Sequence, residues 1–270
     1  MTSPSEKRDL PRRSDWLFRH FSDYTLGYVG KRMHAVRIAR SNPLPALPDG
    51  PLIVVVNHPS WWDPLIGIVL ARKLIGRRHY GPIEAKGLAR YPFLERLGFF
   101  GVDTGTSSGA RAFLRQASAI LEDPRSILWV TAQGEFVDPR KRPIRLKQGV
   151  GHLVHLLKEV TVWTMALEYP FWEERTPEAL VAFGPPLIVE KGASLAPAEW
   201  TARIERTLEA TQDQLAEAAI SRDPARFEIL LSGKAGVGGV YDLWRRFKAM
   251  IHGKAFTAEH ATAVAEDPLK

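Results

Sequence analysis

Short apolar runs alternate with helix-forming stretches along most of this chain, and this alternation limits its possible folds more than any other feature. Each run is short enough to be one strand and is largely apolar, as in strands that are buried on both faces. The runs lie at residues 52–56, 99–102, 127–130, 160–167 and 180–183. Strands separated by helical segments favour an α/β fold, in which helices flank a mainly parallel central sheet.

Helical spacing of apolar residues marks the segments that follow these runs. Pro64 stands where the first turn of a helix over 64–75 would begin, and Ser108 can cap the helix that follows the run 99–102. With 45% hydrophobic residues, a chain of 270 residues can bury these elements around one substantial core. Further helices are predicted over 150–157 and 197–220.

A proline-rich connector at 41–51 separates an N-terminal segment from the alternating elements, and its prolines exclude a regular helix. We therefore expect an N-terminal helical segment at 1–50 and an α/β domain with C-terminal helices at 51–270. Residues 14–29 predict an aromatic-rich amphipathic helix, which could dock on a membrane surface or pack against its own domain. A second aromatic and basic stretch at 241–248 predicts another amphipathic helix.

The charge of the chain indicates an anionic partner. Its net charge is +7 and its isoelectric point is about 9.7, and the basic residues cluster at 1–40, 72–78 and 140–147. The aromatic and basic spacing of known nucleic-acid-binding modules does not occur, so we expect no nucleic acid partner. Anionic lipid or an anionic co-substrate accounts for the clusters equally well.

Several site types and locations are disfavoured by composition. The chain has no cysteine, which excludes disulfides, thiolate metal sites and a cysteine nucleophile. His152 and His155 lack a third ligand in the pattern, so no metal site is predicted. No apolar run approaches the roughly 18 residues that span a bilayer, and the N-terminus lacks the apolar core of a secretory signal. We expect a cytoplasmic protein that is peripheral on the cytoplasmic face of the membrane.

One apolar run is followed at once by a histidine and then by a carboxylate. The histidine is His58, after the run 52–56, and the carboxylate is Asp63. Histidine can accept a proton near neutral pH, and a neighbouring carboxylate fixes its tautomer. Pro59 and Pro64 restrict the backbone, so that Asp63 can fold back onto His58. The two residues are candidates for a general base and its orienting group; a surface histidine with a helix-capping aspartate is the alternative.

This pattern resembles the first signature block of the glycerolipid and lysophospholipid acyltransferases. Three further blocks can be found in order. Residues 98–103 are similar to the second block, and residues 131–136 occupy the place of the third. Residues 147–149, Lys-Gln-Gly, are similar to the family's Lys-x-Gly, and 162–167 lies where the fourth block would be. The resemblance covers roughly residues 50–190.

The resemblance implies direct transfer of a fatty acyl group from a thioester to a hydroxyl. His58 would deprotonate the hydroxyl of a lysophospholipid or another lipid-like acceptor, and Asp63 would orient His58. That hydroxyl would attack the thioester of acyl-CoA or acyl carrier protein, the co-substrate, without a covalent acyl-enzyme and without a further cofactor. The implied partners are this thioester, the lipid acceptor and a membrane lipid surface. Residues expected to contact substrate are Asn57, Asp103, Thr104, Gln133, Gly134, Arg145 and Lys147.

The chain departs from the family pattern at four positions. Thr104 and Phe136 stand where arginine is usual, Gln133 stands where glutamate is usual, and Thr164 replaces a proline. Each missing arginine removes a charge-assisted contact to phosphate, worth about 1.5–3 kcal/mol. The acceptor can therefore lack a phosphomonoester, or basic residues of the loop 140–147 can hold its phosphate instead.

Two other functions remain open. A hydrolase could use His58 and Asp63 to activate water against a thioester or ester. A non-catalytic membrane-binding protein could keep the fold with altered blocks, as Gln133 and Thr164 suggest.

Overall fold

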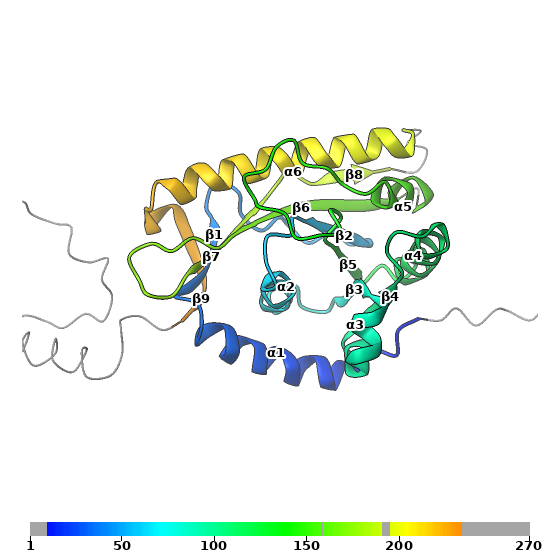
Figure 1. The fold of residues 1–270 in the computed structure, drawn as a ribbon, viewed down its shortest axis with the longest axis horizontal. Coiled ribbons are helices and arrows are strands. Elements are labelled where there is room, and N and C mark those ends of the chain that lie inside the picture. The colour runs from blue at the N-terminus through cyan, green and yellow to red at the C-terminus, as the bar shows by residue number, and fades with distance from the viewer. Residues whose placement is uncertain (1–9, 158, 191–194, 234–270) are drawn as a thin grey trace, which may run out of the picture.

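A sheet of nine strands forms the centre of the part of the chain that the structure describes. The computed structural model describes residues 10–157, 159–190 and 195–233, so the helix predicted over 241–248 lies outside the described residues. The strand order is β4-β3-β5-β2-β6-β7-β1-β9, with β8 paired to β6 (Figure 1). The strands are β1 (Ala35–Ala39), β2 (Leu52–Val56), β3 (Arg78–Glu84), β4 (Phe99–Val102), β5 (Ser126–Val130), β6 (Val160–Glu168), β7 (Glu178–Phe183), β8 (Leu187–Val189) and β9 (Phe227–Ser232).

Most neighbouring strands run parallel. β4, β3, β5, β2 and β6 share one direction, and β1 is parallel to β7. The antiparallel pairs are β6 with β7, β6 with β8, and β1 with β9. The predicted α/β fold with a mainly parallel sheet is confirmed. The carboxyl ends of β2, β3, β4 and β5 therefore lie at one edge of the sheet, where ligands bind in open α/β folds.

Helices cover both faces of the sheet. They are α1 (Asp15–Gly30), α2 (Asp63–Ala71), α3 (Ala85–Arg90), α4 (Ser107–Ile120), α5 (Gly149–Leu157) and α6 (Pro197–Ile220), with 3₁₀ helices η1 (Pro92–Leu97) and η2 (Pro224–Arg226). α1 and α2 lie on one face, and α4, α5 and α6 lie on the other (Figure 1). α1 confirms the helix predicted in the N-terminal segment, while β1, from the same segment, is part of the sheet.

β2 explains why a central strand is apolar throughout. Ile53 and Val55 belong to the core beneath α4, α5 and α6, whereas Leu52, Val54 and Val56 belong to the core beneath α1 and α2. Successive side chains of a strand point to opposite faces, so both sets are buried. The predicted run coincides with the observed strand because both faces of the sheet are covered.

Two predicted helix boundaries are wrong. The cap of α4 is Thr106, whose side chain accepts a hydrogen bond from the backbone of Gly109, because the helix begins before Ser108 and includes it in its first turn. The helix predicted over 64–75 ends at Ala71. The backbone N–H groups of residues 73 and 74 bond three residues back, in tighter turns than those of an α-helix.

β1 was not predicted as an apolar run because its sequence contains a charged residue. Arg37 lies in the middle of this strand, and its side chain is buried. Its Nε donates to Glu178 Oε2 on β7 at 2.9 Å, and His34 Nδ1 bonds to the other oxygen of the same carboxylate. A buried charge is tolerated when it is paired in this way, and the partner is visible only once β1 and β7 are side by side.

The sheet forks at β3. The residues Arg78–Tyr80 pair with β5, whereas Gly81–Glu84 pair with β4. Gly81 N–H donates to Gly98 on the β4 side. Because successive backbone N–H groups of a strand point to opposite sides, the next nitrogen faces β5, and it belongs to Pro82, which has no hydrogen to donate. The ends of β3 and β5 therefore separate.

Candidate active site

His58 and Asp63 meet at the carboxyl edge of the sheet. His58 follows β2 after one residue, and Asp63 is the first residue of α2. The Nδ1 atom of His58 lies 2.6 Å from Asp63 Oδ2. Since a carboxylate oxygen accepts, Nδ1 donates, which leaves Nε2 of His58 free to accept a proton. The local turn predicted from the sequence thus brings the two side chains together.

Two further groups hold the carboxylate of Asp63, whose side chain is only 2% exposed. The backbone N–H of Ser60 donates to Oδ2 at 3.1 Å, and the Tyr169 hydroxyl donates to Oδ1 at 2.7 Å. Burial, followed by the neighbouring Asp63, raises the pKa of Tyr169 well above its ordinary value, so that the phenol keeps its proton. Sequence reasoning missed Tyr169; its signal is that it follows β6 directly.

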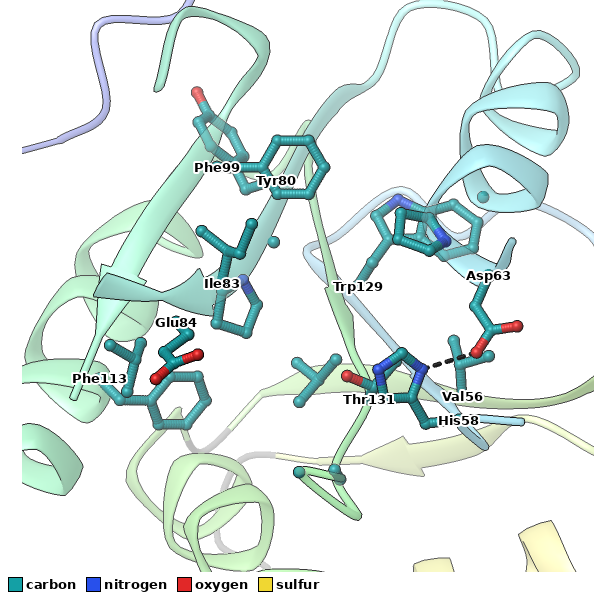
Figure 2. Close-up of a pocket in the computed structure, with 18 of the residues that line it drawn as sticks. Val56, His58, Asp63, Tyr80, Ile83, Glu84, Phe99, Phe113, Trp129 and Thr131 are labelled. Atoms are coloured by element: carbon teal, nitrogen blue, oxygen red, sulfur yellow. Dashed lines mark hydrogen bonds and ion pairs between the residues drawn. The ribbon is translucent and has the colours of Figure 1, made fainter. Parts of the chain in front are cut away.

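A cavity of about 560 Å³ opens in the fork between β3 and β5. His58 and Asp63 lie on one side of it, and Tyr80, Ile83 and Phe99 lie on the other (Figure 2). Most of the surface between them is apolar. A fatty acyl chain is apolar along its whole length, and this cavity can take such a chain with its reactive end beside His58.

Comparison with known proteins decides the family. A family model described as acyltransferase matches residues 26–168, more than half of the chain. The chain belongs to the glycerolipid acyltransferase family. The matched segment of this acyltransferase contains β1 to β6, the His58–Asp63 pair and the fork. No individual curated protein matches the chain. Family membership supports acyl transfer on lipids in general.

Four of the residues predicted to contact substrate line the cavity of this acyltransferase, and three do not. The four are Asp103, Thr104, Gly134 and Lys147. Arg145 is exposed and lies outside the lining. Asn57 and Gln133 are buried and also lie outside it. The family pattern therefore selected residues of two kinds, those that line the cavity and those that lie outside it.

Asn57 and Gln133 fix the backbone of the turn that carries His58. The Asn57 amide makes two hydrogen bonds with the backbone of Leu167 on β6, at 2.8 and 3.1 Å. Gln133 Oε1 accepts from the backbone N–H of His58 at 3.0 Å. The carbonyl of His58 in turn accepts from Val137 at 2.9 Å. The third block and the residue that follows it thus hold His58 at both its backbone N–H and its carbonyl.

Lys147 lies over Gly134 at the cavity wall. Gly134 has a φ of +73°, and a Cβ added there would overlap Cε and Nζ of Lys147. The positive φ favours glycine at this position, since other residues rarely adopt it, and an added Cβ would push the flexible end of the Lys147 side chain aside. The N–H of Gly134 donates to Thr131 O at 3.0 Å and is therefore not free to bind a substrate, whereas Lys147 lines the cavity.

Phe136 covers one face of the His58 ring. The two ring centroids are 4.4 Å apart, and Phe136 is 62% exposed and lines the cavity. The sequence indicated an unusual residue at this position but not its contact with His58. An aromatic ring beside the imidazole supplies an apolar surface where a guanidinium would supply charge.

His79 is a second histidine of the cavity wall and is uncharged near neutral pH. Burial, followed by the charges of Arg13 and Arg77, lowers its pKa to about 3. Its Nδ1 accepts from Trp129 Nε1 at 3.1 Å, and its ring stacks on Phe18. His79 therefore adds a neutral ring to the apolar wall.

The described segments hold no group of three histidine or acidic side chains that could bind a metal ion. Within the same segments, no helix is both long and apolar enough to cross a bilayer.

Proposed function

We propose that this protein transfers a fatty acyl group from the thioester of acyl-CoA or acyl carrier protein to the hydroxyl of a lipid-like acceptor. The observation that carries the proposal is the His58–Asp63 pair at the wall of an apolar cavity. A base with a free Nε2 faces the space in which both substrates can meet. General base catalysis of this kind contributes about 10²–10⁴-fold to a rate.

The proposed reaction moves one proton from the acceptor hydroxyl to the leaving thiol through His58. Nε2 of His58 takes the proton of the acceptor hydroxyl while its oxygen bonds to the thioester carbon. The C–S bond then breaks, and the leaving sulfur takes that proton from His58 and departs as a thiol. Asp63 stabilises the transient imidazolium, and Tyr169 keeps Asp63 in place. No covalent acyl-enzyme forms, in agreement with a chain that has no cysteine.

Lys147 supports the charged stages of this reaction. Its ammonium lies beside Gly134 in the cavity wall and can stabilise negative charge on the thioester oxygen as it develops. Positive charge is favourable here because the thioester oxygen gains negative charge as the acceptor oxygen attacks.

We further propose that the protein docks on the cytoplasmic face of a membrane through a continuous row of aromatic side chains. Successive ring centroids of this aromatic row are 5.5–6.1 Å apart. The row leads from η1 across α1 to the turn that carries His58. Its members are, in order, Phe93, Phe21, Tyr24, Tyr28, Trp62 and Trp61.

Exposure and charge both support a bilayer as the occupant of this surface. Tyr24 and Trp61 are 63% and 62% exposed, although large aromatic side chains are usually buried. Basic residues flank the row at its Tyr28 end: Lys31 and Arg32 are exposed, and the Arg32 guanidinium lies over the Tyr28 ring, 3.7 Å from the ring centroid. Aromatic rings at the headgroup level with adjacent positive charge are typical of proteins that lie on anionic leaflets.

Product analysis tests the acyl transfer. Purified protein is incubated with palmitoyl-CoA and a lipid bearing a free hydroxyl, and products are identified by mass spectrometry. We expect an acylated acceptor and free CoA, with kcat about 10²–10⁴-fold lower in His58→Ala. His152→Ala, an exposed histidine of α5, is the matched control. Undiminished transfer in His58→Ala, or release of free fatty acid with no effect of the acceptor, would contradict the proposal.

A further inference from the structure

The cavity carries few positive charges. Among the described residues, Lys147 is the only lysine or arginine that lines it. Its two histidines add little, since His58 is paired with Asp63 and His79 is neutral. Any anion that enters the cavity would therefore depend on one ammonium group.

Carboxylates outnumber this ammonium. Glu84, Asp103 and Glu135 line the cavity in addition to Asp63, and all three are exposed. Figure 2 shows Glu84 near Phe113, across the cavity from His58. Like charges at such a site disfavour an anionic ligand.

The arginines of the loop after the third block are used elsewhere. Arg140 pairs with Asp138 at 2.6 Å, and Arg142 pairs with Asp213 of α6 at 2.6 Å. Neither of them lines the cavity, and Arg145 also lies outside it. Of the two possibilities left by the sequence, phosphate held by these arginines is thus not supported by their positions.

The surroundings of His58 suit uncharged hydroxyl groups. Thr104 and Thr131 line the cavity, and their hydroxyls can donate and accept hydrogen bonds. Carboxylates accept hydrogen bonds from alcohol groups. Phe136 offers its ring to the C–H groups of an alcohol or polyol beside the base.

We propose that the acceptor presents an uncharged alcohol or polyol at the catalytic end of the cavity, and not a phosphomonoester. This inference rests on the proposed acyl transfer and specifies its acceptor. A phosphomonoester carries about −1.5 to −2 charges at neutral pH and would meet three carboxylates with one ammonium to offset them. A neutral hydroxyl-rich group meets hydrogen-bond partners and no opposing charge.

A matched pair of acceptors tests the proposal. The full chain is assayed with palmitoyl-CoA and either a monoacylglycerol or the same lipid carrying a 3-phosphate, both in uncharged maltoside micelles, so that the micelle surface does not bias the comparison. We expect kcat/KM to be at least about tenfold higher for the monoacylglycerol. Preference for the phosphate-bearing lipid overturns this inference and leaves acyl transfer intact. Formation of only free fatty acid with either lipid overturns the proposed function itself.

Variants locate the cause of the selectivity. Phe136→Arg is expected to raise the relative kcat/KM for the phosphate-bearing lipid about tenfold, whereas Phe136→Leu leaves the ratio near that of the wild type. Glu84→Gln combined with Glu135→Gln is expected to move the ratio in the same direction. The control is Glu228→Gln, which changes an exposed glutamate of β9 away from the cavity. A ratio that neither Phe136→Arg nor the double variant shifts overturns the inference.

Discussion

The hydroxyl of Tyr169 donates a hydrogen bond to Oδ1 of Asp63, while His58 holds the other oxygen of the same carboxylate. Tyr169 and Asp63 are 106 positions apart in the chain. A carboxylate held at both oxygens cannot rotate away from the imidazole. The position of the His58 imidazole therefore depends on β6, which Tyr169 directly follows at this edge of the sheet.

Tyr169→Phe tests this dependence. The change removes the hydroxyl and keeps the ring, so we expect kcat to fall about tenfold with KM nearly unchanged, because a hydrogen bond to a charged group contributes about 1.5–3 kcal/mol. Steady-state kinetics with palmitoyl-CoA measure both constants. Tyr24→Phe, which removes an exposed hydroxyl from α1, is the control. A fall in the unfolding temperature without a change in kcat would show that Tyr169 only supports the fold.

Gly134→Ala is expected to abolish most of the acyl transfer. The new Cβ would displace the Lys147 side chain from the cavity wall, and a positive φ disfavours alanine by about 1–2 kcal/mol. Gly76→Ala separates the two effects, since Gly76 also has a positive φ but has no atoms within 4 Å of an added Cβ. We expect both variants to lose similar stability in urea unfolding and only Gly134→Ala to lose activity. Equal loss of activity in both would argue against a role for Lys147.

His34 is expected to make the protein less stable as the pH rises above about 6.5. The hydrogen bond that His34 donates to Glu178 raises the pKa of His34; burial opposes this shift, and the charges of Glu178 and Glu174 add to it. A raised pKa means that the folded state binds the proton more tightly, so the stabilisation is complete below the unfolded-state pKa and is lost as the pH rises through the folded-state value. Urea unfolding between pH 5.5 and 8.5, at about half-unit steps, measures the slope. His34→Gln is expected to flatten it, whereas His152→Gln is not.

His79 is expected to make the protein less stable as the pH falls below about 6.5. Burial and nearby arginines lower its pKa to about 3, so the unfolded chain takes up a proton below about pH 6.5 that the folded chain does not. The stabilisation present above that pH is then lost as the pH falls, by roughly 1.4 kcal/mol per pH unit between about 6 and 4.5. Urea unfolding of His79→Gln over this range should show a smaller acid slope. An unchanged slope would mean that His79 is protonated in the folded protein.

The aromatic row is expected to set membrane affinity. Replacing Phe93 and Tyr24 together with serine removes two exposed rings that do not line the cavity, and we expect binding to weaken about tenfold or more. Co-sedimentation with vesicles of phosphatidylglycerol and phosphatidylcholine measures the affinity, which should also fall as salt screens the flanking basic residues. Ile220→Ser at the end of α6, on the opposite face of the sheet, is the control. Equal weakening by that control would place the docking surface elsewhere.

The sequence by itself determined those helices and strands in which buried residues follow one another or recur at a regular spacing. The apolar run identifies β2 because its residues are buried by helices on both faces, and amphipathic spacing gives α6 its observed bounds. His58 and Asp63 were predictable for the same local reason, since they lie on a single turn that two prolines restrict.

The tertiary structure decided every feature that needs a partner from elsewhere in the chain. β1 could not be recognised while Arg37 lacked Glu178, and Tyr169 meets Asp63 only because β6 lies beside β2. The fork depends on which neighbour each half of β3 pairs with, and Phe136 meets His58 because the third block folds over the first. Local sequence encodes the periodicity of burial, whereas the pairing of polar groups depends on contacts across the sheet. That pairing sets the charge of the cavity, and with it the acceptor that we propose.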